Sequence, residues 1–309
     1  MVLLSKLISY FTLKKKVIVI CGPTATGKTS LSIMLAKKFN AEVISADSRQ
    51  IYKGLDIGTA KVTEEEKEGV PHHMLDIAGP QDIYSVQEYV QEATKIIRQL
   101  HKENKIPIIC GGSGMYIDSL VCGTQFPKVP PNYALRKELE KKSTDELYSL
   151  LKQQDPRRAK TIDPDNPVRL VRALEVINAI GVVPKIKKQS EYKTLYIGLD
   201  LPKEQLNERI KKRIVERFEN EGMLQEAIDL HTNGLNYERM EQLGLEYRYM
   251  ARYLEKKISY DEMIEQLTTK TIQFAKRQRT WFKRNKNIQW FDPQKDSSQI
   301  VKLTKKFFK

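Results

Sequence analysis

A short glycine-rich stretch near the start of the chain carries the residue types of a phosphate-binding loop. Residues 17–29 read VIVICGPTATGKT, in which Gly22 and Gly27 are separated by four residues and followed by Lys28 and Thr29. Backbone N–H groups in such a loop surround an anion at the positive end of the following helix dipole. The lysine of this pattern reaches the outer phosphates, and the hydroxyl that follows it holds Mg²⁺. The stretch therefore predicts a site for a diphosphate or a triphosphate.

The residues on either side of this loop give it the required structural context. Val17 to Ile20 form a β-branched run, which is typical of a strand buried on both faces. After the loop, apolar residues recur at helical spacing at Leu31, Met34, Leu35 and Phe39. Because strand, loop and helix agree, an accidental glycine-rich loop is disfavoured.

Two further strand-like runs each end in a polar motif. Residues 42–46 lead into Asp47, and residues 106–110 lead into a glycine-rich segment that contains Ser113. A helical pattern over 86–101 lies between them, so the order indicates β-α-β units and a parallel sheet. Ligands bind at the carboxyl ends of the strands in such sheets. We therefore expect the phosphate loop, Asp47 and Ser113 to converge on one crevice.

The position of Asp47 at the end of a buried strand allows three roles. Its carboxylate could accept a proton as a general base, coordinate Mg²⁺, or cap the next segment. A surface or loop aspartate is ionised near pH 7, so it can accept a proton without tuning of its pKa. The sequence does not separate the base from the metal ligand.

Composition favours an anionic macromolecule as partner. The 309 residues include 53 Lys and Arg against 39 Asp and Glu, a formal net charge of +14. Such an excess is typical of proteins that bind polyanions, although a basic enzyme without such a partner is the alternative. The length and a 40% share of hydrophobic residues allow one large domain with an insert.

Cysteine usage and the N-terminus predict a cytoplasmic protein without a membrane anchor. The three cysteines have no CxxC spacing and cannot all pair, which disfavours a zinc module or a disulfide framework and indicates a reducing cytosol. The apolar stretch at residues 2–13 is too short to span a bilayer and is interrupted by Lys6. We interpret it as a lead-in to the first strand.

The chain changes character after Cys122. Prolines at 127, 130 and 131 mark a boundary, residues 132–183 look helical and charged, and residues 194–200 return to strand character. We expect an α/β core with a P-loop NTPase-like parallel sheet and flanking helices over residues 1–121 and 192–309. An all-helical insertion domain over residues 122–191 interrupts it, and the C-terminal part of the core is helical and basic.

Several polar motifs have both a functional and a structural interpretation. The Asp56–Lys61 and Pro71–His73 motifs read as loops, where hydrogen bonds that fix the loop or contacts with phosphate are favoured over a metal site. Arg169 and Arg172 share a helix face that is either a solvated surface or a contact for phosphates. Residues 275–286 hold six cations, Trp281 and Phe282, which suits RNA contact or an exposed basic helix end.

Taken together, these motifs give the chain a resemblance to the bacterial tRNA dimethylallyltransferases (tRNA isopentenyltransferases, the IPP transferase family) over nearly its whole length. The matching motifs, in order, are GPTATGKT (22–29), DSRQIY (47–52), DIGTAK (56–61), PHH (71–73), GGSGMY (111–116), NPVRLVRALE (166–175) and AKRQRTWF (275–282). The resemblance implies transfer of a dimethylallyl group from its diphosphate to N6 of the adenosine just 3′ of the anticodon (tRNA position 37). The products are N6-(dimethylallyl)adenosine and diphosphate.

The resemblance also implies roles for individual residues. Asp47, Lys28 and Thr24 would be catalytic, with Asp47 as the base at the adenosine amine. The diphosphate would be held by Gly22, Pro23, Thr24, Ala25, Thr26, Gly27, Lys28 and Thr29. Arg213, on the helix expected after Asp200, is a further candidate for this role. The tRNA would be contacted by Asp47, Ser48, Arg49, Gln50, Ser113, Arg136, Val168, Arg169, Leu170, Val171 and Arg172. For Arg213, a structural pairing with an acidic side chain is the alternative.

The implied cofactor is Mg²⁺ on Thr29, and the implied partners are dimethylallyl diphosphate and the tRNA anticodon stem-loop, bound by a monomer. Two rival functions use the same motifs. One is a P-loop nucleoside or nucleotide kinase that uses ATP, with the helical insert as a lid. The other is an NTP-regulated RNA-binding protein whose phosphate loop is a switch.

Overall fold

The computed structural model describes residues 15–309, so the expected lead-in at residues 2–13 lies outside the described residues. The chain divides into two compact units. Unit 1 comprises the residues up to Cys122 together with Ser190–Lys309, and unit 2 comprises Gly123–Gln189.

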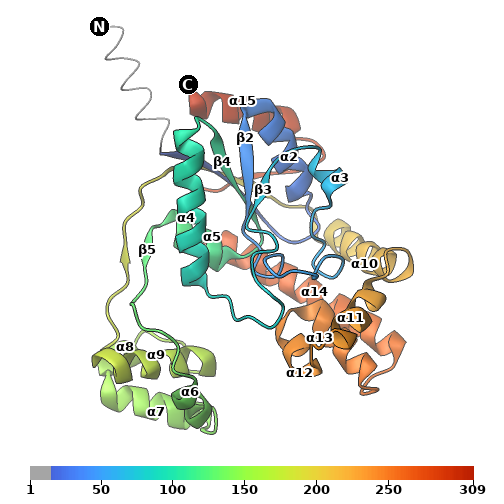
Figure 1. The fold of residues 1–309 in the computed structure, drawn as a ribbon. Coiled ribbons are helices and arrows are strands. Elements are labelled where there is room, and N and C mark those ends of the chain that lie inside the picture. The colour runs from blue at the N-terminus through green and yellow to red at the C-terminus, as the bar shows by residue number, and fades with distance from the viewer. Residues whose placement is uncertain (1–14) are drawn as a thin grey trace, which may run out of the picture. The chain divides into compact units, whose positions relative to one another are not determined.

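Unit 1 is built on a six-stranded sheet in which every neighbouring pair of strands is parallel (Figure 1). The strand order is β3-β2-β4-β1-β7-β8. The strands are β1 (Lys16–Cys21), β2 (Ala41–Ser45), β3 (His72–His73), β4 (Ile106–Gly111), β7 (Lys193–Leu199) and β8 (Gln289–Phe291). The sequence predicts β1, β2, β4 and β7, which form the centre of the sheet, but not the short edge strands β3 and β8.

The helices of unit 1 alternate with these strands and then form a long C-terminal series. They are α2 (Lys28–Phe39), α3 (Glu64–Lys67), α4 (Val86–Lys102), α5 (Gly114–Val121), α10 (Lys203–Glu219), α11 (Met223–Thr232), α12 (Tyr237–Gln242), α13 (Leu245–Leu254), α14 (Tyr260–Phe282) and α15 (Ser297–Phe308). The start of α4 is fixed by a capping box in which Ser85 and Glu88 bond each other's backbone N–H groups. The helix expected over 86–101 is therefore confirmed.

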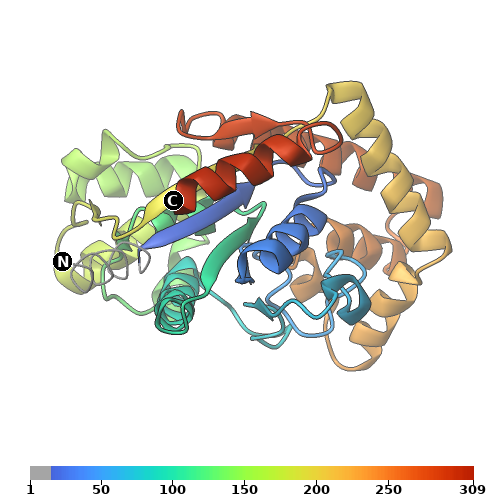
Figure 2. The same cartoon turned by 90° about the horizontal axis from the view of Figure 1, so that it is seen from above.

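The central strand β1 has core on both of its faces, as its β-branched sequence predicts. Val17 and Val19 point to the side covered by α4 and α5, whereas Ile18 and Ile20 point to the side covered by α2 and α15 (Figure 2). Successive residues of a strand face opposite sides of the sheet. The strand β1, which leads into the Gly22–Thr29 loop, is thus packed between two hydrophobic cores.

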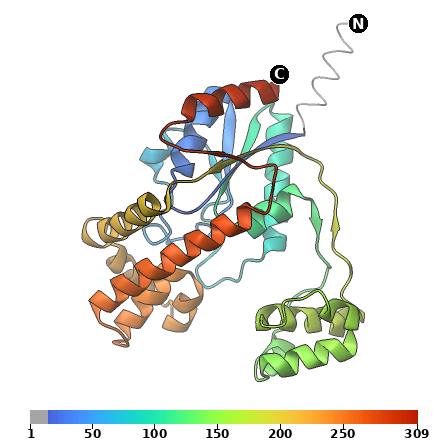
Figure 3. The ribbon, with the colours of Figure 1, turned by 180° about the vertical axis from the view of Figure 1, so that it is seen from behind.

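Helices α10 to α14 surround a third hydrophobic core at the carboxyl end of the sheet. Ile51 and Leu55 from the segment after β2 enter this core together with Ile210, Tyr247 and other buried side chains. The 23-residue helix α14 runs from this helical group back to the sheet, where Phe282 joins the core beneath α4 and α5 (Figure 3). The same helix therefore touches two cores.

Unit 2 contains four helices around its own core. They are α6 (Tyr133–Leu139), α7 (Thr144–Gln154), α8 (Pro156–Ala159) and α9 (Pro167–Ile180). Leu147, Leu151, Leu170 and Leu174 are all buried in this core. Besides the expected helices, two short antiparallel strands, β5 (Thr124–Gln125) and β6 (Lys187–Lys188), pair the two ends of the insertion.

No helix within residues 15–309 is both long enough and apolar enough to cross a lipid bilayer.

Candidate active site

The Gly22–Thr29 loop connects β1 to α2 with the geometry of an anion cradle. Gly27 has a left-handed φ of 81°, and α2 begins at the next residue with its N–H groups directed toward the loop. Gly22 has a φ of 142°, and a Cβ atom there would lie 2.2 Å from the carbonyl oxygen of Leu199. Only glycine fits at position 22, because β7 passes so close to the loop.

Inside the loop, the carbonyl of Pro23 accepts hydrogen bonds from nearby side chains. The hydroxyl of Thr26 donates to the Pro23 carbonyl at 2.9 Å, and Thr26 is fully buried. Gly22 and Pro23 shape the loop, whereas the cavity in front of it is lined from Thr24 onward. The Thr26 hydroxyl is thus engaged within the loop, although Thr26 also lines the cavity. That all eight loop residues hold the diphosphate stays a prediction.

Lys28 lies over the loop, and its ammonium group donates to the Pro23 carbonyl at 2.6 Å. Burial, together with the positive charge of Arg213, lowers the pKa of this ammonium to about 8, although the carboxylate of Asp47 acts in the opposite direction. An anion bound in the loop would stabilise the charged form of Lys28.

Asp47 and Ser113 come together at the carboxyl ends of β2 and β4, as the sequence predicts. The Ser113 N–H donates to the Ala46 carbonyl at 3.0 Å, and the Ser113 hydroxyl accepts from the Ser48 N–H at 3.0 Å. The Arg49 N–H donates to Asp47 Oδ1 at 2.9 Å, which fixes the carboxylate. Gly111 permits this approach, because a Cβ there would lie 2.2 Å from the Ala46 carbonyl oxygen.

Arg213 reaches the Gly22–Thr29 loop from α10. Its Nη2 donates to the Thr24 hydroxyl at 2.6 Å, and burial lowers the pKa of its guanidinium to about 10. Within residues 15–309, Arg213 forms no ion pair with a carboxylate, and its buried Nε has no hydrogen-bond partner. Its placement therefore favours the diphosphate role over the structural pairing that the sequence left open.

Two cavities meet at these residues. The first has a volume of about 1280 Å³ and lies against the Gly22–Thr29 loop, and the second has a volume of about 510 Å³ and includes Met115, Tyr116, Phe274 and Trp281 in its lining. Six residues line both cavities, and we call them the junction: Thr24, Asp47, Thr59, Gly112, Arg213 and Arg217. The phosphate cradle and the carboxylate thus face a shared space.

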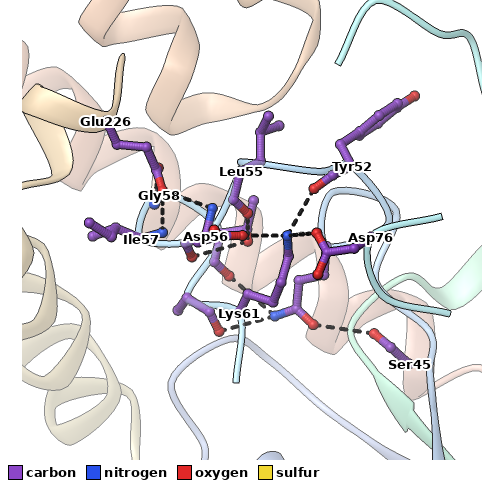
Figure 4. Close-up of polar contacts among 12 residues, drawn as sticks. Ser45, Tyr52, Leu55, Asp56, Ile57, Gly58, Lys61, Asp76 and Glu226 are labelled. Carbon is purple, nitrogen blue, oxygen red and sulfur yellow. Dashed lines mark hydrogen bonds and ion pairs between the residues drawn. The ribbon is translucent and has the colours of Figure 1, made fainter. Parts of the chain in front are cut away.

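The segment Leu55–Lys61 forms one wall of the first cavity and is held from both sides (Figure 4). Its backbone N–H groups at 56, 57 and 58 all donate to the carboxylate of Glu226 on α11, at 2.7 to 2.9 Å. Arg217 donates to the carbonyls of residues 57 and 58 at 2.9 and 2.8 Å. Hydrogen bonds within the protein therefore hold this wall in place.

Two further side chains complete this network, those of Lys61 (Figure 4) and Gln50. Lys61 is buried and donates to the Tyr52 carbonyl and to the carboxylates of Asp56 and Asp76 at 2.5 to 2.8 Å. Gln50 donates from Nε2 to the carbonyls of residues 59 and 60. These contacts agree with the interpretation that the 56–61 motif carries hydrogen bonds that fix the loop, and they occupy the side-chain amide of Gln50.

Comparison with known proteins identifies the family at this point. The model of a family described as IPP transferase matches residues 50–285. A tRNA dimethylallyltransferase of Anoxybacillus flavithermus is 42% identical over 289 residues, which cover 92% of each chain. The chain belongs to the IPP transferase family.

Solved structures of IPP transferases have the same fold. The full-length tRNA isopentenylpyrophosphate transferase of Bacillus halodurans is similar with a TM-score of 0.73 and 36% identity, covering 95% of this chain and 97% of that one. A eukaryotic dimethylallyltransferase acting on tRNA is similar with a TM-score of 0.83 and 29% identity, covering 95% of this chain and 79% of that one. The predicted fold class and the assignment as a transferase of this family are confirmed.

In this IPP transferase, some residues of the basic motif at 275–286 form contacts within the protein and others are exposed to solvent. Arg279 pairs with Asp200 at 2.6 Å, and the indole N–H of Trp281 donates to Asp118 at 2.8 Å. The remaining cations of residues 275–286 are exposed: Lys276, Arg277, Lys283, Arg284 and Lys286. One of the six cations is therefore a structural ion pair, and five can face an anionic surface.

The arginines expected from unit 2 have different surroundings. Glu175 is almost fully buried and accepts from Arg136 at 2.8 and 2.9 Å, from the Asn132 N–H at 2.6 Å, and from Arg172. Burial disfavours the charged form of Glu175, but these hydrogen bonds outweigh it and hold its pKa at about 2. Arg136 and Arg172 are thus engaged within unit 2.

The other unit 2 residues divide by exposure. Val168 and Arg169 are exposed, and Arg169 has only a distant carboxylate, Asp163, at 3.8 Å. Leu170 and Val171 are buried in the core of unit 2. The side chains of Leu170 and Val171 fill this core, and the expected contact of tRNA with these two positions stays a prediction.

In the Pro71–His73 motif, which the sequence predicts as a loop, the two histidines form an edge strand. His72 and His73 pair with Val43 and Ile44 as β3. His72 Nδ1 lies 2.8 Å from the Val70 carbonyl, and His73 Nε2 lies 2.6 Å from Glu42. Both histidines thus form contacts at hydrogen-bond distance with neighbouring parts of the structure.

Sequence reasoning did not assign four residues that shape this site: Thr59, Arg217, Glu226 and Gln278. Thr59 and Gln278 lie inside motifs that the sequence singled out, so their position was a signal. Arg217 and Glu226 lie outside those motifs, and their contacts with residues 56–58 span about 160 to 170 residues of sequence. Only the folded chain reveals such pairs.

Proposed function

We propose that this protein transfers the dimethylallyl group of dimethylallyl diphosphate to N6 of the adenosine 3′ to the anticodon of a tRNA. The observation that carries the proposal is the junction, where a carboxylate and a phosphate cradle face the space shared by two cavities. Membership of the IPP transferase family supports this chemistry over ATP-dependent phosphoryl transfer to a nucleoside.

The diphosphate would bind in the first cavity. Loop N–H groups, the ammonium of Lys28 and the guanidinium of Arg213 would surround its oxygens, and the Thr24 hydroxyl lies between Arg213 and the loop. These groups would stabilise the negative charge that develops on the leaving diphosphate, which is usually the largest catalytic contribution.

Thr29 fits a role in holding Mg²⁺, because it is exposed in the first turn of α2 and lines the same cavity. With no cluster of protein carboxylates in the described residues, most ligands would be phosphate oxygens and water, as is usual for Mg²⁺. The ion would neutralise charge on the leaving diphosphate when bound.

The acceptor adenine would bind in the second cavity, whose lining combines apolar and aromatic groups with Arg49, Arg248 and Arg277. Its exocyclic amine is a poor nucleophile, because its lone pair is delocalised into the ring. Asp47 would accept a proton from N6 as the N6–C bond forms, while the C–O bond to diphosphate breaks and its electron pair leaves with the diphosphate. The Arg49 N–H occupies Oδ1, which leaves Oδ2 of Asp47 for the proton.

The tRNA would be held through its backbone. Phosphates can be contacted by the five exposed cations of residues 275–286 and by the exposed Arg169 of unit 2, and the net charge of +14 favours a polyanion. An adenosine in a single-stranded anticodon loop leaves its stack at a cost of a few kcal/mol, roughly. One chain carries the whole junction, so we propose that the active species is a monomer.

A product assay tests this function. The protein is incubated with Mg²⁺, dimethylallyl diphosphate and unmodified tRNA, and the tRNA is digested to nucleosides for mass spectrometry. We expect an adenosine heavier by one C₅H₈ unit, together with free diphosphate. Absence of that product, with phosphate transferred from ATP to a nucleoside instead, would assign the protein to the kinases.

A further inference from the structure

We propose that Gln278 is a positioning residue that fixes the Gly22–Thr29 loop against the Gly112–Ser113 segment, and so sets the phosphate cradle relative to Asp47. This inference rests on the proposed function, because it deepens the account of the same site. Gln278 lies on α14, far in sequence from both segments, and is only 6% exposed.

The side-chain amide of Gln278 bridges the two segments directly. Its Oε1 accepts from the Thr24 N–H at 2.8 Å, and its Nε2 donates to the Gly112 carbonyl at 3.0 Å. The Thr24 N–H can only donate and the Gly112 carbonyl can only accept, so a group with one acceptor and one donor is required. The orientation of the amide is therefore determined by its partners, and a carboxylate could satisfy only one of them.

The surroundings of Gln278 show how closely α14 approaches these segments. A Cβ on Gly112 would lie 2.2 Å from Gln278 Nε2, and a Cβ on Gly114 would lie 2.3 Å from the ring of Trp281. Two bonds of neighbouring residues anchor the helix, from Arg279 to Asp200 and from Trp281 to Asp118. These bonds hold α14 in place, and Gln278 connects this helix to the Gly22–Thr29 loop.

The bridge extends to the catalytic carboxylate. Gly112 precedes Ser113, whose hydroxyl accepts from the Ser48 N–H, and Ser48 follows Asp47. The Thr24 hydroxyl on the other side receives Arg213. Gln278 therefore links the leaving-group half of the junction to the proton-accepting half, although it does not itself contact a reacting atom.

The geometry has a specific consequence for the diphosphate. Because the Thr24 N–H is occupied by Gln278, the diphosphate would be held by the N–H groups further along the loop and by side chains. Thr24 would act through its hydroxyl. The role expected for Thr24 is therefore limited to its hydroxyl, which accepts a hydrogen bond from Arg213.

The test compares Gln278→Glu with Gln273→Glu, an exposed position on the same helix that receives the same change of charge. At pH 8 the introduced carboxylate at 278 would repel the Gly112 carbonyl and leave it without a donor. We expect dimethylallyl diphosphate to bind about tenfold more weakly or worse, as for a buried polar group left unsatisfied. At pH 5 a protonated carboxyl can donate to Gly112, so the ratio of affinities of variant and wild type returns toward one.

Amide hydrogen exchange in the wild-type protein provides a second measurement that does not depend on a variant folding. We expect the Thr24 N–H to be protected before ligand is added and unchanged by dimethylallyl diphosphate, while the N–H groups of Gly27 and Lys28 gain protection. Rapid exchange of Thr24 in the free protein, or wild-type binding by Gln278→Glu at pH 8, would overturn the inference. Failure of the wild type to bind dimethylallyl diphosphate would instead overturn the proposed function, since Thr24 protection in the free protein is independent of it.

Discussion

Two groups of buried or half-buried cations in this molecule differ in what balances their charge. At the junction of unit 1, burial lowers the pKa of Lys28 to about 8 and that of Arg213 to about 10, and neither forms an ion pair with a carboxylate within residues 15–309. In unit 2, Glu175 raises the pKa of Arg136, and the same contacts hold the pKa of Glu175 at about 2.

The contrast indicates which group binds a ligand. A buried cation without an internal counter-charge is costly, so it persists where an anion binds. A buried acid surrounded by arginines is balanced internally and serves the structure of its unit, because removing one partner leaves the other uncompensated. The role of an arginine in a motif therefore depends on whether a carboxylate within the protein balances its charge.

The largest expected effect is on the chemistry at the junction. Asp47→Ala should lower the rate of dimethylallyl transfer by about a hundred- to ten-thousand-fold, because the base is lost. Single-turnover transfer, measured by the mass of the nucleosides, gives this rate, and filter binding should give a tRNA affinity within a few-fold of wild type. More than about a tenth of the wild-type rate would exclude Asp47 as the base.

The matching change in unit 2 should affect stability and not ligand binding. Glu175→Gln leaves Arg136 and Arg172 without a counter-charge and should lower the stability of the unit by about 3 kcal/mol. Thermal unfolding followed by circular dichroism measures this change, and dimethylallyl diphosphate affinity is the control. The stabilisation should also depend on pH: because the pKa of Glu175 is lower when folded, it is present above about pH 4.5 and is lost as pH falls toward 2. Unchanged stability would contradict the structural role.

The lowered pKa of Lys28 predicts a pH dependence of diphosphate binding. An anion raises the pKa of this ammonium in the complex, so binding takes up a proton above pH 8, and affinity should fall by up to about tenfold per pH unit there. Isothermal titration with dimethylallyl diphosphate between pH 7 and 9.5 measures it. The variant Lys28→Met should bind weakly and lose this dependence, and an equally steep decline in that variant would point to another group.

The smallest expected effect concerns the exposed cation of unit 2. Arg169→Ala should weaken tRNA binding by only a few-fold and reduce the slope of log affinity against log salt by about 1, because one phosphate contact is lost. The variant for comparison is Arg136→Ala, which removes an arginine that is already hydrogen-bonded to Glu175. A salt slope that is flat for the wild-type protein would show that the charge of +14 is incidental to tRNA binding.

Local patterns in the sequence predicted the central strands of the sheet and the positions of the phosphate loop, Asp47 and Ser113. The β-branched run before Gly22 and the helical spacing after Thr29 identified β1 and α2, and the rule for parallel sheets placed Asp47 beside Ser113. These features depend on neighbours in sequence or on strand order, which a pattern can show.

The remainder depended on pairs that lie far apart in the chain. The amide of Gln278 meets Thr24 across 254 residues, and Arg213 meets Thr24 across 189. A pattern in one segment cannot show such a partner. Glu175 is the exception, because it lies three residues after Arg172 within a motif that was already recognised, and its spacing could have indicated that the arginine is engaged.

One titration tests the contrast between the two units most directly. Dimethylallyl diphosphate is titrated calorimetrically into the wild type, Arg213→Met and Arg136→Met at pH 7, after circular dichroism has shown that each protein is folded. We expect Arg213→Met to bind about tenfold more weakly or worse, since a charge-assisted contact is lost, and Arg136→Met to bind as the wild type does. Equal affinities for all three proteins, or a loss confined to Arg136→Met, would contradict the assignment of the anion site to the junction.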